Sequence, residues 1–188
     1  TDFVGMNEKF KAYAEKIAKA ALAAKPADVE ALKAATIDGE TVEEVVTDCI
    51  HVMGENTQLA RVAVVEAPAV AAYIHGGGKI GVLVNFETDL AADKVEAVGK
   101  DVAMQIAAMS PRFWDKSQVD DATLEEEKKI MLVQMANDPK MAAKPAQVKE
   151  KIVAGKLNKF YAENCLLQQD FVKNADVTVE QYVAAAAK

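Results

Sequence analysis

Hydrophobic positions near the start of the chain follow helical periodicity. Apolar residues recur every three or four positions after Asn7, which predicts a helix capped by that residue. The apolar face comprises Phe10, Tyr13, Ala14, Ile17 and Ala21. Pro26 marks the end of this helix, a short helix follows, and Asp38-Gly39 is a turn signal. Thr41 and Glu44 have the spacing of a capping box, so another helix is expected to begin at Thr41.

Extended segments take over after Gly54. Residues 61–66, 70–75 and 80–84 are short and apolar, as strands are. A run of three glycines at 76–78 joins the last two, which predicts an antiparallel hairpin with a tight turn. A helix is expected next, and Ser110-Pro111 ends it. Its apolar residues are Val95, Val98, Val102, Ile106 and Met109.

Two further helices are expected in the second half of the chain, after a loop at 112–120. Thr123 and Glu126 have capping-box spacing and predict the start of the first helix. Asn137-Asp138-Pro139 breaks it, and the second helix begins near Pro145. Two helices of similar length around one tight break predict an antiparallel helical hairpin, in the manner of a short coiled coil.

The chain also contains an internal repeat. Thr1-Asp2-Phe3 before one helix matches Thr88-Asp89-Leu90 before another, and residues 41–46 match residues 178–183. The strand before Thr88 has no counterpart before Thr1, and the strand expected from Arg61 has none after Lys188. We therefore expect a duplicated fold that lacks a strand at each end, as a piece of a longer protein would.

These patterns together predict an α+β fold. Two duplicated subdomains would each combine a small antiparallel sheet with packed helices, and a helical hairpin would be inserted into the second. The expected boundaries are 1–68 for the first subdomain, 69–121 with 164–188 for the second, and 122–163 for the hairpin.

Composition and charge narrow the function. Hydrophobic residues make up 51% of the 188 residues, which excludes a disordered chain. The net charge of −7 repels phosphate backbones, so direct nucleic-acid binding is not expected. The apolar runs are too short for a membrane-spanning helix, which requires about 18 residues.

The side chains that could carry catalysis or bind metal form no recognisable site. Cys49 and Cys165 have no zinc or redox spacing and are expected to be buried thiols. His75 has only His51 and the two cysteines as possible co-ligands, again without suitable spacing, so no metal is expected. The glycine run lacks the phosphate-loop pattern, and no nucleophile or carboxylate accompanies His75. We expect neither an enzyme nor a cofactor.

Several motifs in order along the chain resemble the elongation factor Ts family. The start resembles that family's strand-to-helix signature, and the later motifs follow in family order over nearly the whole chain. They are Thr1-Asp2-Phe3-Val4, Gly54-Glu55-Asn56 with Arg61-Val62, Tyr73-Ile74-His75-Gly76 through Gly81-Val82-Leu83-Val84, the stretch 101–108 with Ser110-Pro111, and the stretches 155–160 and 165–172. The family also has an N-terminal three-helix domain and a closing Gly-Glu-Gly segment, neither of which is expected in this chain.

The resemblance implies guanine-nucleotide exchange on elongation factor Tu, in a bacterial cytoplasm or an organelle. It places the partner contacts at Asp2, Phe3, Val4, Met53, Gly54, His75 and Gly76. Asp2 and Phe3 would approach the Mg²⁺ region of the partner, with Phe3 as a wedge. From the residues alone, Asp2 could instead cap the first helix while Phe3 packs in the core. Leu90 at the matching repeat position suggests that the fold does not require a phenylalanine there.

A second function from another class remains open. The helical hairpin could make the chain a structural module that self-associates, with a homodimer formed through its two helices.

Overall fold

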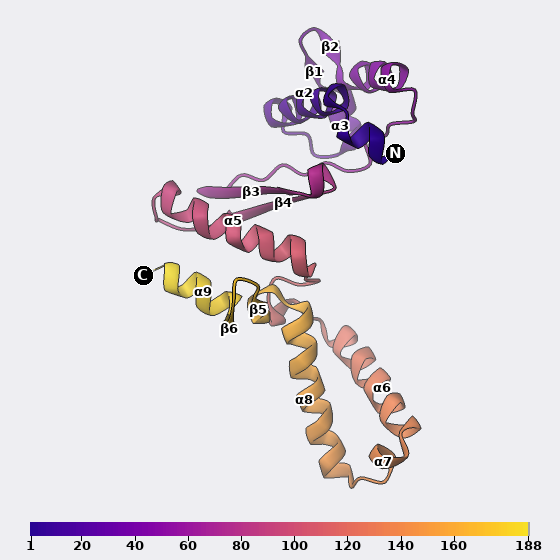
Figure 1. The fold of residues 1–188 in the computed structure, drawn as a ribbon, viewed down its shortest axis with the longest axis vertical. Helices are drawn as coiled ribbons and strands as arrows, with labels where there is room; N and C mark the ends of the chain where they lie inside the picture. Colours follow the sequence, from indigo (N-terminus) through magenta and orange to yellow (C-terminus); the bar gives the residue numbers. More distant parts are fainter. Residues whose placement is uncertain (188) are drawn as a thin grey trace. The chain divides into compact units, whose positions relative to one another are not determined.

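A computed structural model describes residues 1–187 as helices and small antiparallel sheets (Figure 1). The chain forms two compact units. The first contains residues 1–70 and 74–87, and the second contains residues 71–73 and the chain from Thr88 onward. Each of the sheets in the described chain has two antiparallel strands. This confirms the predicted α+β class.

The first unit begins with helices that its own polar residues cap. Its elements are α1 (Asp2–Met6), α2 (Glu8–Ala24), α3 (Val29–Ala34), β1 (Thr36–Ile37), β2 (Glu40–Thr41) and α4 (Val42–Met53). The Asn7 side chain accepts a hydrogen bond from the Lys9 N–H, which confirms the predicted cap of α2. Thr41 and Glu44 form both bonds of the predicted capping box. Asp38 and Gly39 both have positive φ, the conformation that a two-residue hairpin turn between β1 and β2 requires.

Small side chains bring the helices of this unit together. Ala20 and Ala21 of α2 are buried against Leu32 of α3 and Val42 of α4. Alanine lets helix backbones approach closely, so the core is compact although the chain has few aromatic residues.

The predicted glycine hairpin is confirmed. It consists of β3 (Ala69–His75), a 3₁₀ turn η1 (Gly76–Gly78) and β4 (Ile80–Phe86). The strand expected at 61–66 is wrong, because this stretch has no strand pairing within the described residues. Its valines are half-buried, so side-chain burial accounts for the apolar pattern there without a sheet.

The second unit carries the helical hairpin. Its elements are α5 (Ala92–Met109), η2 (Lys116–Gln118), α6 (Asp121–Asn137), α7 (Pro139–Ala142), α8 (Ala146–Asn164), η3 (Leu166–Gln168), β5 (Asp170–Phe171), β6 (Asn174–Thr178) and α9 (Val179–Ala186). Helices α6 and α8 run antiparallel, and the single turn α7 lies at their tip (Figure 1). The cap predicted at Thr123 is wrong. Asp120 caps α6, and its carboxylate accepts from the Thr123 N–H at 2.6 Å.

The two units repeat one order of elements. In the first, α2 is followed by the β1–β2 hairpin and by α4 with its capping box. In the second, α5 is followed by the β5–β6 hairpin and by α9, which begins with a capping box of Thr178 and Gln181. In the first unit, the short helix α3 lies between α2 and the β1–β2 hairpin. In the second unit, the whole insertion from η2 to η3 lies between α5 and the β5–β6 hairpin.

A buried amide pair holds the base of the insertion to α5. The Gln105 Nε2 donates to Gln169 Oε1 and to the Asp170 carbonyl, each at 3.1 Å. The Gln105 Oε1 accepts from the Val172 N–H at 2.8 Å, and Gln169 Nε2 donates to the Glu163 carbonyl at 3.0 Å. Both side chains are fully buried, so every polar group in this network depends on its partner.

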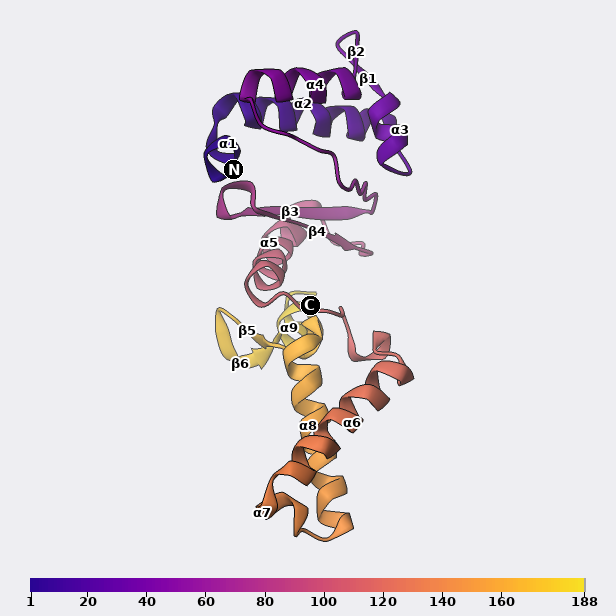
Figure 2. The same cartoon turned by 90° about the vertical axis from the view of Figure 1, so that its right-hand side faces the viewer.

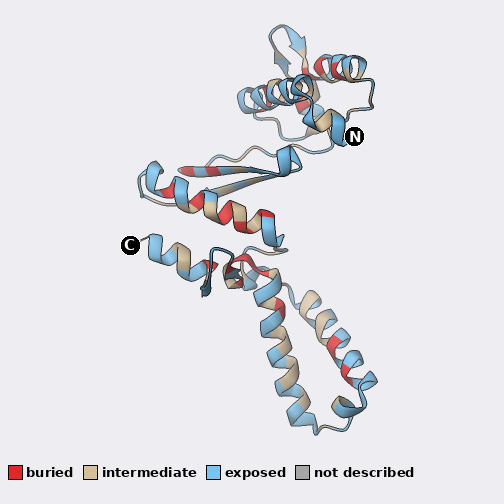
Figure 3. Ribbon diagram, in the orientation of Figure 1, coloured by how far each residue is buried: buried red, intermediate tan, exposed pale blue. Residues whose placement is uncertain are grey.

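An apolar cluster closes the base of the helical hairpin, at the end away from α7. Val119, Met131, Phe160 and Cys165 are buried together. Figure 3 shows that few positions of α6 and α8 are buried and that most of the surface of these two helices is exposed or half-buried. Both cysteines are free and buried, as expected. The division at 122 and 163 remains a prediction.

Candidate partner-binding site

Helix α1 presents the first group of predicted site residues. The Thr1 hydroxyl accepts from the Val4 N–H at 3.5 Å and caps the helix, and Asp2 in the first turn complements the helix dipole. Phe3 is 84% exposed, whereas Val4 is half-buried. The alternative in which Asp2 caps the helix and Phe3 packs in the core is therefore wrong on both points.

The end of α4 carries the second group. Met53 is the last helical residue and is half-buried. Gly54 follows with φ of +70°, and its N–H donates to the Ile50 carbonyl at 2.8 Å. A side chain is disfavoured in this left-handed conformation, so glycine suits the cap.

The β3–β4 hairpin carries the third group. His75 is exposed at the end of β3, and Gly76 opens the turn η1. All three glycines of the turn have positive φ, between +61° and +102°. The backbone conformation of the turn therefore explains the run of glycines, because residues with a Cβ atom are disfavoured at positive φ.

Two polar contacts connect these three groups within the first unit. The Thr1 hydroxyl donates to Glu55 Oε1 at 2.6 Å, which links α1 to the residue after Gly54. The Lys79 ammonium lies 3.1 Å from Asp2 Oδ1, which links α1 to the hairpin turn. Figure 2 shows α1 beside the turn between β3 and β4. The predicted residues therefore gather at one end of the unit.

A cavity of about 580 Å³ lies between α1, α2 and the hairpin turn. Its lining residues are Thr1, Asp2, Gly5, Met6, Phe10, Lys11, Ala14, Gly76, Gly77, Gly78 and Lys79. Helix α1 has no buried residue. Its position beside the turn consequently depends on polar contacts more than on a packed core.

The two linking side chains, Glu55 and Lys79, were not recognisable as site residues from the sequence. Glu55 lies inside the motif Gly54-Glu55-Asn56, but nothing in that motif indicates its contact with Thr1, which is 54 positions away in the sequence. Lys79 gave no local signal, because it meets Asp2 only through the turn of the hairpin.

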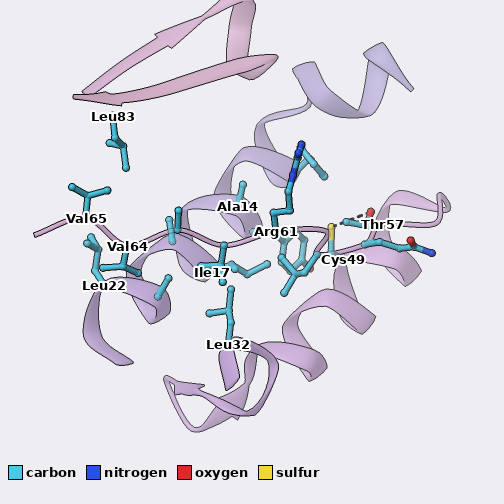
Figure 4. Close-up of a pocket in the computed structure, with 18 of the residues that line it drawn as sticks. Ala14, Ile17, Leu22, Leu32, Cys49, Thr57, Arg61, Val64, Val65 and Leu83 are labelled. Atoms are coloured by element: carbon cyan, nitrogen blue, oxygen red, sulfur yellow. Dashed lines mark hydrogen bonds between the residues drawn. The ribbon is translucent and has the colours of Figure 1, made fainter. Parts of the chain in front are cut away.

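A larger apolar cavity of about 690 Å³ lies beside α2 in the same unit (Figure 4). Ile17, Leu32, Val64 and Leu83 are among its lining residues. Cys49 also lines it, and its thiol lies 4.0 Å from the Thr57 hydroxyl. Most of the lining is apolar, although Tyr13, Thr57, Gln58 and Arg61 also contribute to it.

Within residues 1–187 no cluster of histidine, cysteine, aspartate or glutamate could hold a metal ion. No helix among the described residues is both long and apolar enough to cross a membrane. What the described surface offers is an exposed aromatic side chain, a carboxylate and a glycine turn close together, which suits contact with another protein.

The fold and this surface define an α+β protein built from two repeated units with an inserted helical hairpin. Comparison with known proteins then gives the family. The family model described as Elongation factor TS matches residues 1–188, and the chain belongs to the elongation factor Ts family of translation elongation factors.

Relatives in several bacteria support the same assignment. The chain is 45% identical to elongation factor Ts of Clostridioides difficile (strain 630) over 190 residues, which cover all of this chain and 61% of that protein. It is 45% identical to elongation factor Ts of Deinococcus radiodurans, with 67% of that protein covered. For Clostridium kluyveri the identity is 40%, with 62% covered. The chain thus spans about three fifths to two thirds of the length of these relatives.

Proposed function

We propose that this chain binds elongation factor Tu and accelerates the release of GDP from it. Membership of the elongation factor Ts family supports this partner. The observation that carries the proposal is the exposure of Phe3 on a capped helix start, where an aromatic side chain has no role in the core. A large aromatic side chain that is exposed when free and buried in a complex is typical of residues that dominate binding energy.

The contact surface in this proposal comprises Asp2, Phe3, Val4, Met53, Gly54, His75 and Gly76. Phe3 would wedge into a pocket of the GTPase and displace a packed helix. Asp2 would approach the region of the partner's Mg²⁺ ion and disturb its coordination indirectly. A GTPase holds its nucleotide through Mg²⁺ and phosphate contacts, so either change weakens GDP binding.

No covalent chemistry is needed for this activity. An exchange factor must bind the open, nucleotide-poor state more tightly than the closed state. By thermodynamic linkage, the factor and the nucleotide then weaken each other's binding by the same factor. The net charge of −7 agrees with a protein partner rather than a nucleic acid, and the proposed location is a bacterial cytoplasm or an organelle.

The test is the release of fluorescently labelled GDP from elongation factor Tu. With excess unlabelled GDP present, the release rate is expected to rise with the concentration of this chain and then to saturate. The control is elongation factor Tu with an unrelated acidic protein of similar size. A release rate that does not respond to this chain contradicts the proposal.

Self-association through the helical hairpin is a second candidate function. Several apolar side chains on its helices are exposed, namely Ile130, Leu132, Val133 and Val148. A groove of about 520 Å³ runs along α6 and α8, and Leu132 and Val153 line it. Sedimentation analysis over a range of protein concentrations tests this candidate. A dimer that Leu132→Glu dissociates would support it, and a monomer at every concentration would exclude it.

A further inference from the structure

Helix α1 lies beside a cavity, and few contacts hold it. It has five residues, none of them buried, and the cavity of about 580 Å³ separates part of its surface from α2 and the hairpin turn. An isolated helix of this length is far too short to be stable in water. Contacts from the rest of the unit must therefore fix the direction in which Phe3 points.

Two side chains provide these contacts from two different elements. Glu55 follows α4 and accepts a hydrogen bond from the Thr1 hydroxyl at 2.6 Å. Lys79 follows the glycine turn and pairs with Asp2 at 3.1 Å. The two contacts approach α1 from different elements and attach to adjacent residues, so together they restrain both the position and the rotation of the helix.

We infer that Lys79 and Glu55 are positioning residues for the exchange activity, which hold α1 so that Asp2 and Phe3 are presented to the GTPase. This inference rests on the proposed function. It assigns Lys79 and Glu55 no contact with the partner: each acts through the helix start that it holds.

Because Lys79 and Asp2 are exposed, a positioning role of Lys79 can be distinguished from a role in stability. The side chains of Lys79 and Asp2 are 67% and 77% exposed. Exposed ion pairs contribute little to global stability. Loss of Lys79 should therefore leave the melting temperature unchanged while lowering the fraction of molecules in which α1 is in place.

That fraction determines the apparent affinity for the partner. When only part of a population is competent to bind, the apparent dissociation constant rises in inverse proportion to that part. A saturating concentration of partner restores the bound geometry. Lys79→Gln should therefore raise the half-saturating concentration in the GDP-release assay by up to about fivefold, the upper end of the range expected for one exposed ion pair, with the maximal rate unchanged.

The matched control is Lys19→Gln. Lys19 pairs with Glu15 on α2 at 2.7 Å, and both side chains are exposed to a similar degree as Lys79 and Asp2. This variant also removes one positive charge and one exposed ion pair, but no contact to α1. It should match the unmodified protein, as should Lys79→Arg, which keeps the charge. Glu55→Ala, which removes the acceptor of the Thr1 hydroxyl, should resemble Lys79→Gln.

A double-mutant comparison separates positioning from direct contact. If Lys79 acts through Asp2, Lys79→Gln should change little in a protein that already carries Asp2→Asn. Additive effects of the two substitutions would overturn the inference, because Lys79 would then act independently of Asp2. A half-saturating concentration unchanged in Lys79→Gln would overturn it too.

A second measurement does not depend on exchange. Nuclear magnetic resonance of the free protein should show faster amide hydrogen exchange in residues 4–7 for Lys79→Gln, but not for Lys19→Gln. If the unmodified protein does not accelerate GDP release, the proposed function is refuted, but the positioning role of Lys79 is not. Unchanged amide exchange in Lys79→Gln would refute the positioning role, whatever the assay on elongation factor Tu shows.

Discussion

The Tyr182 hydroxyl donates a hydrogen bond to Asp101 Oδ2 at 2.8 Å and so joins α9 to α5 in the second unit. Lys173 donates to the other carboxylate oxygen at 2.5 Å. The first unit also pairs tyrosine with aspartate, since Tyr13 of α2 donates to Asp48 of α4. The tyrosine lies on the earlier helix in one unit and on the later helix in the other, so the two units use the same interaction in opposite directions.

This arrangement makes the stability of the second unit depend on pH. Burial alone would raise the pKa of Asp101, but the hydrogen bonds from Lys173 and Tyr182 outweigh burial and lower it. Above the unfolded pKa, near 4, the ionised carboxylate stabilises the fold, and this contribution is lost as pH falls through the lower folded pKa. Burial and Asp101 raise the pKa of Tyr182 to about 12, so the tyrosine remains a donor throughout this range.

Asp101→Asn should therefore destabilise the protein at neutral pH by about 1–2 kcal/mol, since hydrogen bonds to a charged group are lost. The difference from the unmodified protein should shrink as pH falls below about 4. Urea unfolding followed by circular dichroism at a series of pH values measures it. A difference that stays constant across the acid range would show that the charge of Asp101 contributes nothing to folding.

Gln105→Ala should be among the more damaging single substitutions in the second unit. It removes a fully buried side chain and takes a hydrogen-bond partner from the Val172 N–H, the Gln169 Oε1 and the Asp170 carbonyl. We expect a loss of about 2–4 kcal/mol, from these lost hydrogen bonds and a cavity. Gln147→Ala on the exposed surface of α8 is the control and should change stability little. Equal effects of the two substitutions would mean that the amide network does not hold α5 to the β5–β6 hairpin.

Phe3→Ala should slow GDP release from elongation factor Tu by about tenfold or more, the loss expected for an aromatic residue central to an interface. The melting temperature should not change, because Phe3 is exposed in the free protein. Leu90→Ala is the matched control from the other repeat and should leave the release rate unaltered. A lower melting temperature with an unchanged release rate would make Phe3 a structural residue.

The helical hairpin should tolerate shortening but not full excision. Replacing residues 134–151 with a short glycine-rich turn keeps Met131 and Phe160 in the cluster at the base. Thermal unfolding of the remainder should then be little changed. Replacing residues 122–163 removes both side chains and exposes Val119 and Cys165, so we expect a loss of several kcal/mol.

Equal melting temperatures for the two deletions would support a hairpin that is independent of its base. They would also support the predicted boundaries at 122 and 163. Unfolding of both would contradict any division of the second unit at the hairpin.

Most of the helices and the glycine hairpin could be predicted from the sequence, because periodicity and turn residues act locally, and the resemblance of motifs in order along the chain indicated the family. Helix α4 illustrates this, since its capping box depends on Thr41 and Glu44, three positions apart. The strand expected at 61–66 was wrong for the complementary reason. An apolar stretch becomes a strand only when another backbone pairs with it, and local composition carries no information about that partner.

For the candidate site, too, some features could be predicted from the sequence and others required the tertiary structure. The resemblance of local sequence motifs pointed to Asp2, Phe3 and Val4, to Met53 and Gly54, and to His75 and Gly76, and glycines at turn positions can be recognised locally because they alone adopt positive φ readily. Only the tertiary structure decided that Phe3 is exposed and that Glu55 and Lys79 both contact α1. The contact of Glu55 with Thr1 and that of Lys79 with Asp2 join residues more than 50 positions apart, and the folding of the chain brings them within hydrogen-bonding distance.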